Sequence, residues 1–185
     1  MAANKTTDQK KVSGKAIAVA FVILVIWIGG FFVASHFNGS LRLDSPEAIR
    51  AALSESTHSN GVEILQTADA GGFRAVLFDP GTPGDPADDG LALFVPDMLF
   101  RSRWCYYNVA GQNAKEPLTL FCDTMQGDNG YTVIAVYGSG IPDTVSSFTL
   151  TADGEVLDTQ PITGSSLLAL YRTAHPVTDV SIAAS

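Results

Sequence analysis

Residues that carry out catalysis are scarce in this chain of 185 residues. It has only three histidines, His36, His58 and His175, and two cysteines, so a nucleophile with an adjacent base has few candidates. The G-x-S-x-G, H-E-x-x-H, phosphate-loop and dinucleotide-binding motifs are all missing. We therefore predict no catalytic residue and no cofactor, and the sequence favours a non-enzymatic protein over an enzyme.

Basic residues are also few, and they are unevenly distributed. The chain has 11 Lys and Arg against 19 Asp and Glu. Residues 1–35 hold four lysines and one aspartate, a net charge of +3, whereas residues 36–185 hold seven basic and 18 acidic residues, a net charge of −11. A surface of that charge repels phosphate backbones and anionic lipid headgroups. We therefore expect no nucleic-acid partner.

Charge is absent altogether from residues 16–35. As a helix, these 20 residues are long enough to cross the hydrocarbon core of a bilayer, which is about 30 Å thick. The lysines before the run predict a cytoplasmic N-terminus and an extracytoplasmic body. The alternative is a secretory signal cleaved after Ser35. The length of the run favours an uncleaved, single-pass anchor in the cell membrane, whose partner is the lipid bilayer.

The rest of the chain predicts an α+β domain that is mostly β. We expect a cytoplasmic basic head at 1–15, a transmembrane helix at 16–35, an exposed linker at 36–44 and an extracytoplasmic domain at 45–185. Within that domain, Ser45-Pro46-Glu47 predicts the start of one short amphipathic helix, residues 46–55. Alternating apolar residues then predict an antiparallel sheet under the helix and a β-sandwich-like C-terminal half. The expected strands are 62–67, 73–78, 91–95, 103–109, 118–123, 131–137, 147–151, 155–158, 166–171 and 177–183. Turn residues between them predict two hairpins, 62–67 with 73–78 and 147–151 with 155–158.

The spacing of the two cysteines suggests a structural disulfide. If strands 103–109 and 118–123 form a hairpin around the polar loop between them, facing residues have numbers that add to about 227, as Cys105 and Cys122 do. Outside the cytoplasm such a pair oxidises and stays oxidised. Two free thiols, a metal site and a redox-active pair are the alternatives. The lack of nearby histidine argues against the metal, and the lack of a C-x-x-C motif argues against the redox-active pair.

The loop before strand 91–95 is rich in acids. Asp79, Asp85, Asp88 and Asp89 are candidate calcium ligands, because hard cations bind several convergent oxygens. Their spacing matches no EF-hand, so a solvated acidic loop without metal is favoured.

A second cluster, around Arg101, Arg103 and Trp104, is a candidate contact for an anionic or sugar ligand. Strand alternation places its members on two sheet faces, which favours cross-strand packing over a joint binding site.

Four segments, together with the acidic loop, form a pattern: F-R-A-V-L-F (73–78), L-A-L-F-V (91–95), R-S-R-W (101–104) and Y-T-V-I-A-V-Y-G (131–138). In this pattern the chain resembles a loose group of small single-span proteins of Gram-positive bacteria. The resemblance implies a location in the bacterial envelope and carries over no functional residue. We expect an interaction or sensing module with an envelope protein partner. The alternatives are an envelope hydrolase, a calcium- or ligand-binding domain, and a domain secreted after signal cleavage.

Overall fold

The computed structural model describes residues 14–81, 89–111, 120–127 and 130–185. The chain divides into two compact units, residues 1–39 and residues 40–185; we call the second unit the C-terminal domain. The described part has two helices and antiparallel sheets, which confirms the predicted mostly-β class. The strands are β1 Glu63–Ala70, β2 Phe73–Asp79, β3 Gly90–Pro96, β4 Trp104–Gly111, β5 Phe121–Gln126, β6 Thr132–Ser139, β7 Ser147–Ala152, β8 Glu155–Pro161, β9 Ser166–Arg172 and β10 Val180–Ala184.

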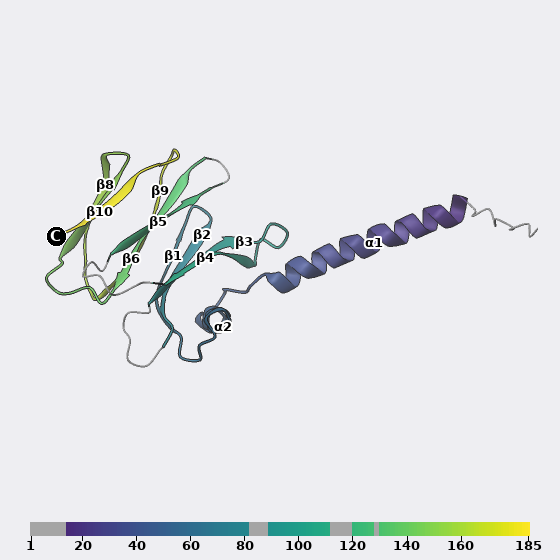
Figure 1. The fold of residues 1–185 in the computed structure, drawn as a ribbon, viewed down its shortest axis with the longest axis horizontal. Helices are drawn as coiled ribbons and strands as arrows, with labels where there is room; N and C mark the ends of the chain where they lie inside the picture. Colours follow the sequence, from purple (N-terminus) through teal and green to yellow (C-terminus); the bar gives the residue numbers. More distant parts are fainter. Residues whose placement is uncertain (1–13, 82–88, 112–119, 128–129) are drawn as a thin grey trace, which may run out of the picture. The chain divides into compact units, whose positions relative to one another are not determined.

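Helix α1, Gly14–Gly39, contains the whole uncharged run of residues 16–35 (Figure 1). Lys15 is its only lysine or arginine, it has no acid, and it has no proline to interrupt it. The helix is long and apolar enough to cross a membrane, a property that membrane anchors and signal sequences share.

Helix α2, Pro46–Thr57, begins where the sequence predicts and continues two residues beyond the predicted end. The side chain of Ser45 caps it by accepting a hydrogen bond from the backbone N–H of Ala48, at 3.2 Å. The helix ends because His58 adopts a left-handed conformation with φ of 56°.

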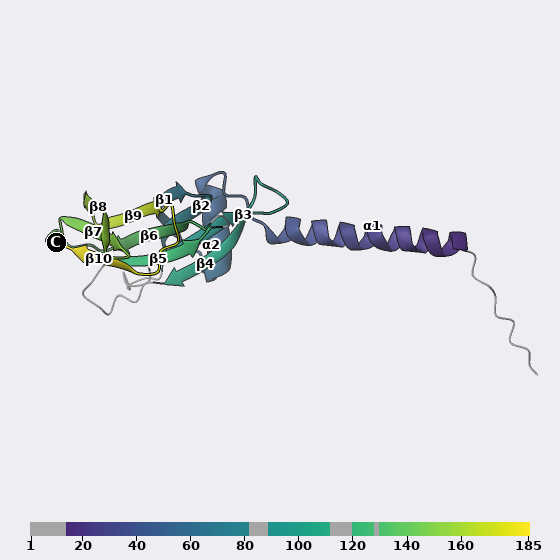
Figure 2. The same ribbon diagram turned by 90° about the horizontal axis from the view of Figure 1, so that it is seen from above.

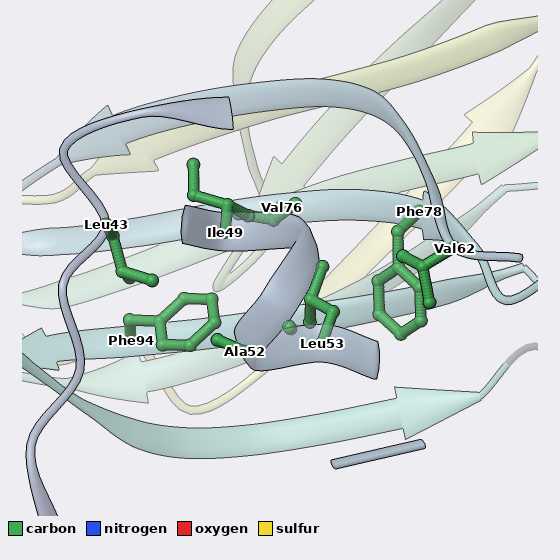
Figure 3. Packing of buried hydrophobic residues seen from close by; sticks show 9 residues of the cluster. Leu43, Ile49, Ala52, Leu53, Val62, Val76, Phe78 and Phe94 are labelled. Atoms are coloured by element: carbon green, nitrogen blue, oxygen red, sulfur yellow. The ribbon is translucent and has the colours of Figure 1, made fainter. Parts of the chain in front are cut away.

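Strands β1 to β4 form one antiparallel sheet in chain order. The predicted hairpin of β1 and β2 is confirmed, and Gly71 and Gly72 supply the positive φ angles of its turn. One face of the sheet lies under α2, so that the predicted apolar face of the helix is buried against β2 and β3 (Figure 3). This cluster contains Leu43, Ile49, Ala52, Leu53, Val62, Val76, Phe78, Ala92 and Phe94.

The other strands form two more sheets, in the orders β5-β6-β9 and β10-β7-β8. Every residue of β6 is buried, because its two faces pack against different sheets. Val133 and Ala135 face the cluster with β2 and β3, whereas Ile134 and Val136 face the cluster with β7. The domain is therefore layered as α2, the β1–β4 sheet, the β5-β6-β9 sheet and the β10-β7-β8 sheet (Figures 1 and 2).

The expected hairpin of strands 103–109 and 118–123 is wrong. β4 pairs with β3 and β5 pairs with β6, so the two strands belong to different sheets. Each strand pairs across a short connection, residues 97–103 for β4 and residues 127–131 for β5, instead of across the longer connection between β4 and β5. Short loops close at lower entropic cost, and the buried Met125 fixes β5 in the core beneath β2 and β3.

The other late elements follow the sequence in part. The hairpin of β7 and β8 is confirmed, and β10 joins it on the other side of β7. β9 instead pairs with β6, so the four late strands do not make one sheet. The expected exposed linker also differs, because Ser40 and Leu43 are buried in the C-terminal domain.

Candidate functional site

The β3–β4 loop, residues 97–103, has a closely defined backbone. Asp97 at its start is only 1% exposed, and its Oδ1 accepts hydrogen bonds from the N–H groups of Leu99 and Phe100, both at 2.8 Å. The N–H of Asp97 donates to the carbonyl of Arg103 at 2.8 Å and closes the loop. The carboxylate of Asp97 thus organises the loop.

The exposed side chains of this loop are apolar or basic, apart from that of Ser102. Met98 is 75% exposed and Leu99 is 41% exposed. Arg101 is also exposed, and within the part of the chain that the structure describes it makes no hydrogen bond or ion pair. The loop therefore offers an apolar pair beside an available guanidinium group.

A cleft of about 500 Å³ lies beside the loop; we call it the Tyr107 cleft. Met98 and Arg101 line it from the loop, and three aromatic rings line it from three strands or their ends, Phe73, Tyr107 and Tyr131. Its other lining residues are Gly71, Gly72, Val95, Pro96, Asp97, Gln126 and Gly127.

The aromatic rings of the cleft are held by specific contacts. The rings of Phe73 and Tyr107 meet edge to face, with centroids 5.4 Å apart and an interplanar angle of 87°. The hydroxyl of Tyr131 donates to the carbonyl of Gly71, and the guanidinium of Arg172 lies 4.3 Å from the centre of the Tyr131 ring. Tyr107 is 48% exposed and so remains accessible to a ligand.

Two glycines allow Tyr131 to lie where it does. A Cβ atom at Gly127 would lie 2.1 Å from Cζ of Tyr131, and one at Gly71 would lie 2.7 Å from Cγ2 of Val133. Gly71 also has a φ of +58°, which disfavours any other residue. Both turns therefore need glycine for the floor of the cleft to form.

The predicted ligand cluster is divided, although not by strand alternation, because Arg101 and Arg103 lie in the β3–β4 loop and β4 begins only at Trp104. Arg101 lines the cleft, whereas Nε of Arg103 donates to Oγ of Ser40 at 2.6 Å and its Nη2 donates to the carbonyl of Ser40. Trp104 exchanges two backbone hydrogen bonds with Leu41, of 2.7 and 2.9 Å. Arg103 and Trp104 thus fix the start of the C-terminal domain, and Arg101 alone of the three is available to a ligand.

A second groove, of about 570 Å³, lies between the start of α2 and β1. Two arginines, Arg50 and Arg74, line this groove. The guanidinium of Arg74 already has partners: Nε and Nη2 donate to the carboxylate of Asp69 at 2.7 and 2.8 Å, and Nη1 donates to the carbonyl of Leu43 at 2.6 Å. The same group lies 4.7 Å from the centre of the Trp104 ring. These contacts make Arg74 a structural residue.

Half of the candidate calcium cluster can be located. Oδ1 of Asp79 accepts a hydrogen bond from the N–H of Gly81 at 2.6 Å, and Asp89 is buried. Asp85 and Asp88 lie outside the described residues. Across residues 14–81, 89–111, 120–127 and 130–185, no three histidine, cysteine or acidic side chains form a metal-binding group.

Cys105 and Cys122 are free thiols, so the predicted disulfide is not formed. The physical reason is the strand pairing, which places them in different sheets. Sγ of Cys105 donates to Oδ2 of Asp97 at 3.4 Å. Burial, followed by that hydrogen bond, raises the pKa of Cys105, and burial raises the pKa of Cys122. Both thiols therefore stay protonated near neutral pH and are poor nucleophiles.

Phe73 and Tyr131 are among the cleft residues that sequence reasoning missed, together with Met98 and Gln126. The glycines beside Phe73 and Tyr131, at 71–72 and 127, mark turns in the sequence but do not show that the two turns meet. No family model, curated protein or solved structure matches the chain. Its geometry is therefore the basis for a functional proposal.

Proposed function

We propose that the protein is a single-pass membrane protein whose C-terminal domain is an extracytoplasmic, non-enzymatic interaction module of the cell envelope. The observation that carries the proposal is the exposure of α1: its large apolar side chains are 48–74% exposed. At about 1.5 Å per residue, its 26 residues extend about 39 Å, more than the hydrocarbon core needs. A bilayer is the solvent that suits such a surface.

The proposed orientation rests on charge. The lysines that precede the uncharged run favour a cytoplasmic N-terminus. The net charge of −11 on residues 36–185 does not oppose export, because acidic residues contribute little to membrane orientation. We also propose that the two C-terminal sheets, which share a buried cluster, act as a sandwich-like support for the layers nearer α2.

The Tyr107 cleft and the β3–β4 loop are the contact site that this proposal assigns. Aromatic faces, the Arg101 guanidinium and the Gln126 amide are groups that bind a ligand. The acid in the described lining, Asp97, is buried and hydrogen-bonded within the loop, which supports binding over acid–base chemistry.

Cell fractionation tests this proposal. The full chain with a C-terminal epitope tag should stay in the membrane pellet after an alkaline carbonate wash. Protease added to cells whose cell membrane is intact and directly accessible from the medium should remove the tag. A matched variant with Leu24→Lys and Ile28→Lys should leave the pellet, since each central lysine costs about 2.5–3.5 kcal/mol of insertion free energy.

Two outcomes would contradict the proposal. A tag fully protected in intact cells would reverse the orientation. Mass spectrometry of any secreted product gives its N-terminus. If that residue is His36, residues 16–35 are a cleaved signal and not an anchor.

A further inference from the structure

The β3–β4 loop is tied to the residues that directly follow α1. Its last residue, Arg103, binds both the side chain and the carbonyl of Ser40, and the next residue, Trp104, pairs with Leu41. Ser40 follows Gly39, the last residue of α1. The base of the loop is therefore held at the point where the chain leaves the helix.

Chain length limits how far this point can lie from a bilayer that contains α1. Five residues lead from Ser35, the end of the uncharged run, to Ser40. They cover about 8 Å as a helix and at most about 18 Å when fully extended. The headgroup region on each side of the hydrocarbon core is itself about 5–8 Å deep. The base of the loop is thus within or just beyond the headgroups, whatever angle the domain adopts.

The outer side chains of the loop match that environment. Met98 and Leu99 are exposed, and apolar side chains enter the boundary between headgroups and acyl chains readily. Arg101 has no partner in the described part of the chain, and a guanidinium binds phosphate oxygens through paired hydrogen bonds. A single exposed methionine is ordinary on a soluble protein. Here the apolar pair and the arginine occur together in a loop whose base is held at the end of residues 36–40, the tether between the uncharged run and the C-terminal domain.

The distribution of charge favours the same contact. Arg42, Arg101 and Arg103 lie within three residues of the Leu41–Trp104 bridge, and the exposed Asp44 is the one acid in the same range of the sequence. From residue 116 to the end, the chain has one basic residue and eight acids. Although the body as a whole is repelled by anionic headgroups, this asymmetry turns its arginine-bearing end toward them.

We infer that residues 97–103 dock on the surface of the bilayer in which the chain is anchored, with Met98 and Leu99 in the interfacial region and Arg101 on the phosphate of an anionic lipid. The inference rests on the proposed function and deepens it, since it names the partner of one wall of the Tyr107 cleft. The contact between residues 97–103 and the lipid keeps the C-terminal domain at the surface of the membrane.

The test uses the full chain reconstituted into vesicles of phosphatidylcholine alone or mixed with phosphatidylglycerol. A polarity-sensitive dye is attached at Met98→Cys or, as the matched control, at Val156→Cys, an exposed site on β8, with Cys105 and Cys122 changed to serine. In anionic vesicles the dye at position 98 should shift to the blue and resist an aqueous quencher, whereas the dye at position 156 should not. Arg101→Ala should reduce the equilibrium constant for docking about fivefold in anionic vesicles, the effect of one arginine near such a surface.

A second readout needs no substitution. Peroxide should oxidise Met98 of the unmodified chain more slowly in anionic than in neutral vesicles, with the buried Met125 as the internal reference for an intact fold. Equal accessibility at positions 98 and 156, or equal oxidation of Met98 in both lipids, overturns the inference while the protein still floats with the vesicles. Loss of flotation after a carbonate wash instead rejects the anchor, and with it both proposals.

Discussion

A single carboxylate, that of Asp153, connects the turn between β7 and β8 to the residues that directly precede β10. Its Oδ1 accepts hydrogen bonds from the N–H and Oγ1 of Thr178, at 3.0 and 2.9 Å, and from the N–H of Asp179 at 2.9 Å. The hydrogen bonds from the Asp179 and Thr178 backbone, followed by that from the Thr178 hydroxyl, lower the pKa of Asp153 below its usual range. The ionised form of Asp153 is thus favoured in the folded state.

This lowered pKa predicts a pH-dependent effect of Asp153→Asn. A carboxylate with a depressed folded-state pKa stabilises the fold above its unfolded pKa of about 3.9, and this stability is lost as the pH falls through the folded value. The variant should therefore melt below the wild type at neutral pH, and the difference should shrink as acid protonates Asp153. Melting temperatures across the pH range measure it, with the exposed Asp143→Asn as control; a constant difference at every pH would contradict the assignment.

The candidate site also shows what single residues reveal in a sequence. Arg101 could be identified because arginines beside aromatic residues form a local pattern. Phe73 and Tyr131 could not, because Phe73 lies on β2, away from the loop in the sequence, and Tyr131 directly precedes β6 of another sheet. Both meet the loop only after long-range packing. Arg103 was a candidate for ligand binding by the same local pattern, yet its donors bind Ser40, more than sixty residues away in the sequence.

Among the elements, α2 depends on signals that are local and therefore readable. Ser45 caps the helix, Pro46 fits its first turn, and the apolar face consists of residues three and four positions apart. The hairpins β1–β2 and β7–β8 were predictable for the same reason, since their turn residues lie between the paired strands.

Leu53 carries much of the packing of α2 and gives a test of this element. Its side chain is fully buried between the helix and the first sheet, so Leu53→Ala should lower the free energy of unfolding by about 2–5 kcal/mol. The exposed Glu55→Ala on the same helix should change it by no more than about 0.5 kcal/mol. Urea denaturation of both variants measures the difference, and equal effects would show that α2 is only loosely attached.

The pairing of β4 and β5 was not readable from the sequence. Their spacing allows a hairpin, and the coincidence of Cys105 with Cys122 supported one. Two shorter connections compete for the same strands, and which pairing wins depends on how the three sheets stack. Period-two patterns locate strands but do not assign their neighbours.

At the scale of the whole molecule, the C-terminal domain is unified by its middle sheet. β6 contributes alternate residues to two buried clusters, and β2 and β3 do the same on either side of the first sheet. A continuous apolar run such as that of β6 is typical of a strand buried on both faces. The number and order of the layers were not predictable, because they depend on contacts between distant segments.

This stacking predicts that a substitution that destabilises one layer also destabilises the others, because the layers unfold together. Ile134 packs toward β7, and Ile134→Val should lower the free energy of unfolding by about 1 kcal/mol. Trp104 packs against the cluster under α2, and in a Trp27→Phe background its fluorescence reports on that far layer. The Trp104 transition should move by the same amount as the transition seen by circular dichroism; an unmoved Trp104 transition would mean that the layers unfold independently.

The Leu41–Trp104 bridge has a mechanical consequence. Tension between the membrane and anything bound to the domain enters at Ser40 and reaches this isolated pair of hydrogen bonds before the continuous ladder between β3 and β4. The hydrogen bonds from Arg103 to Ser40 and the bridge at Leu41 therefore take the load before the sheet does. Detaching residues 40–43 from β4 would lengthen the chain between α1 and the sheets by about 14 Å, while every strand pair stays intact. The junction would therefore extend before force reaches the sheets.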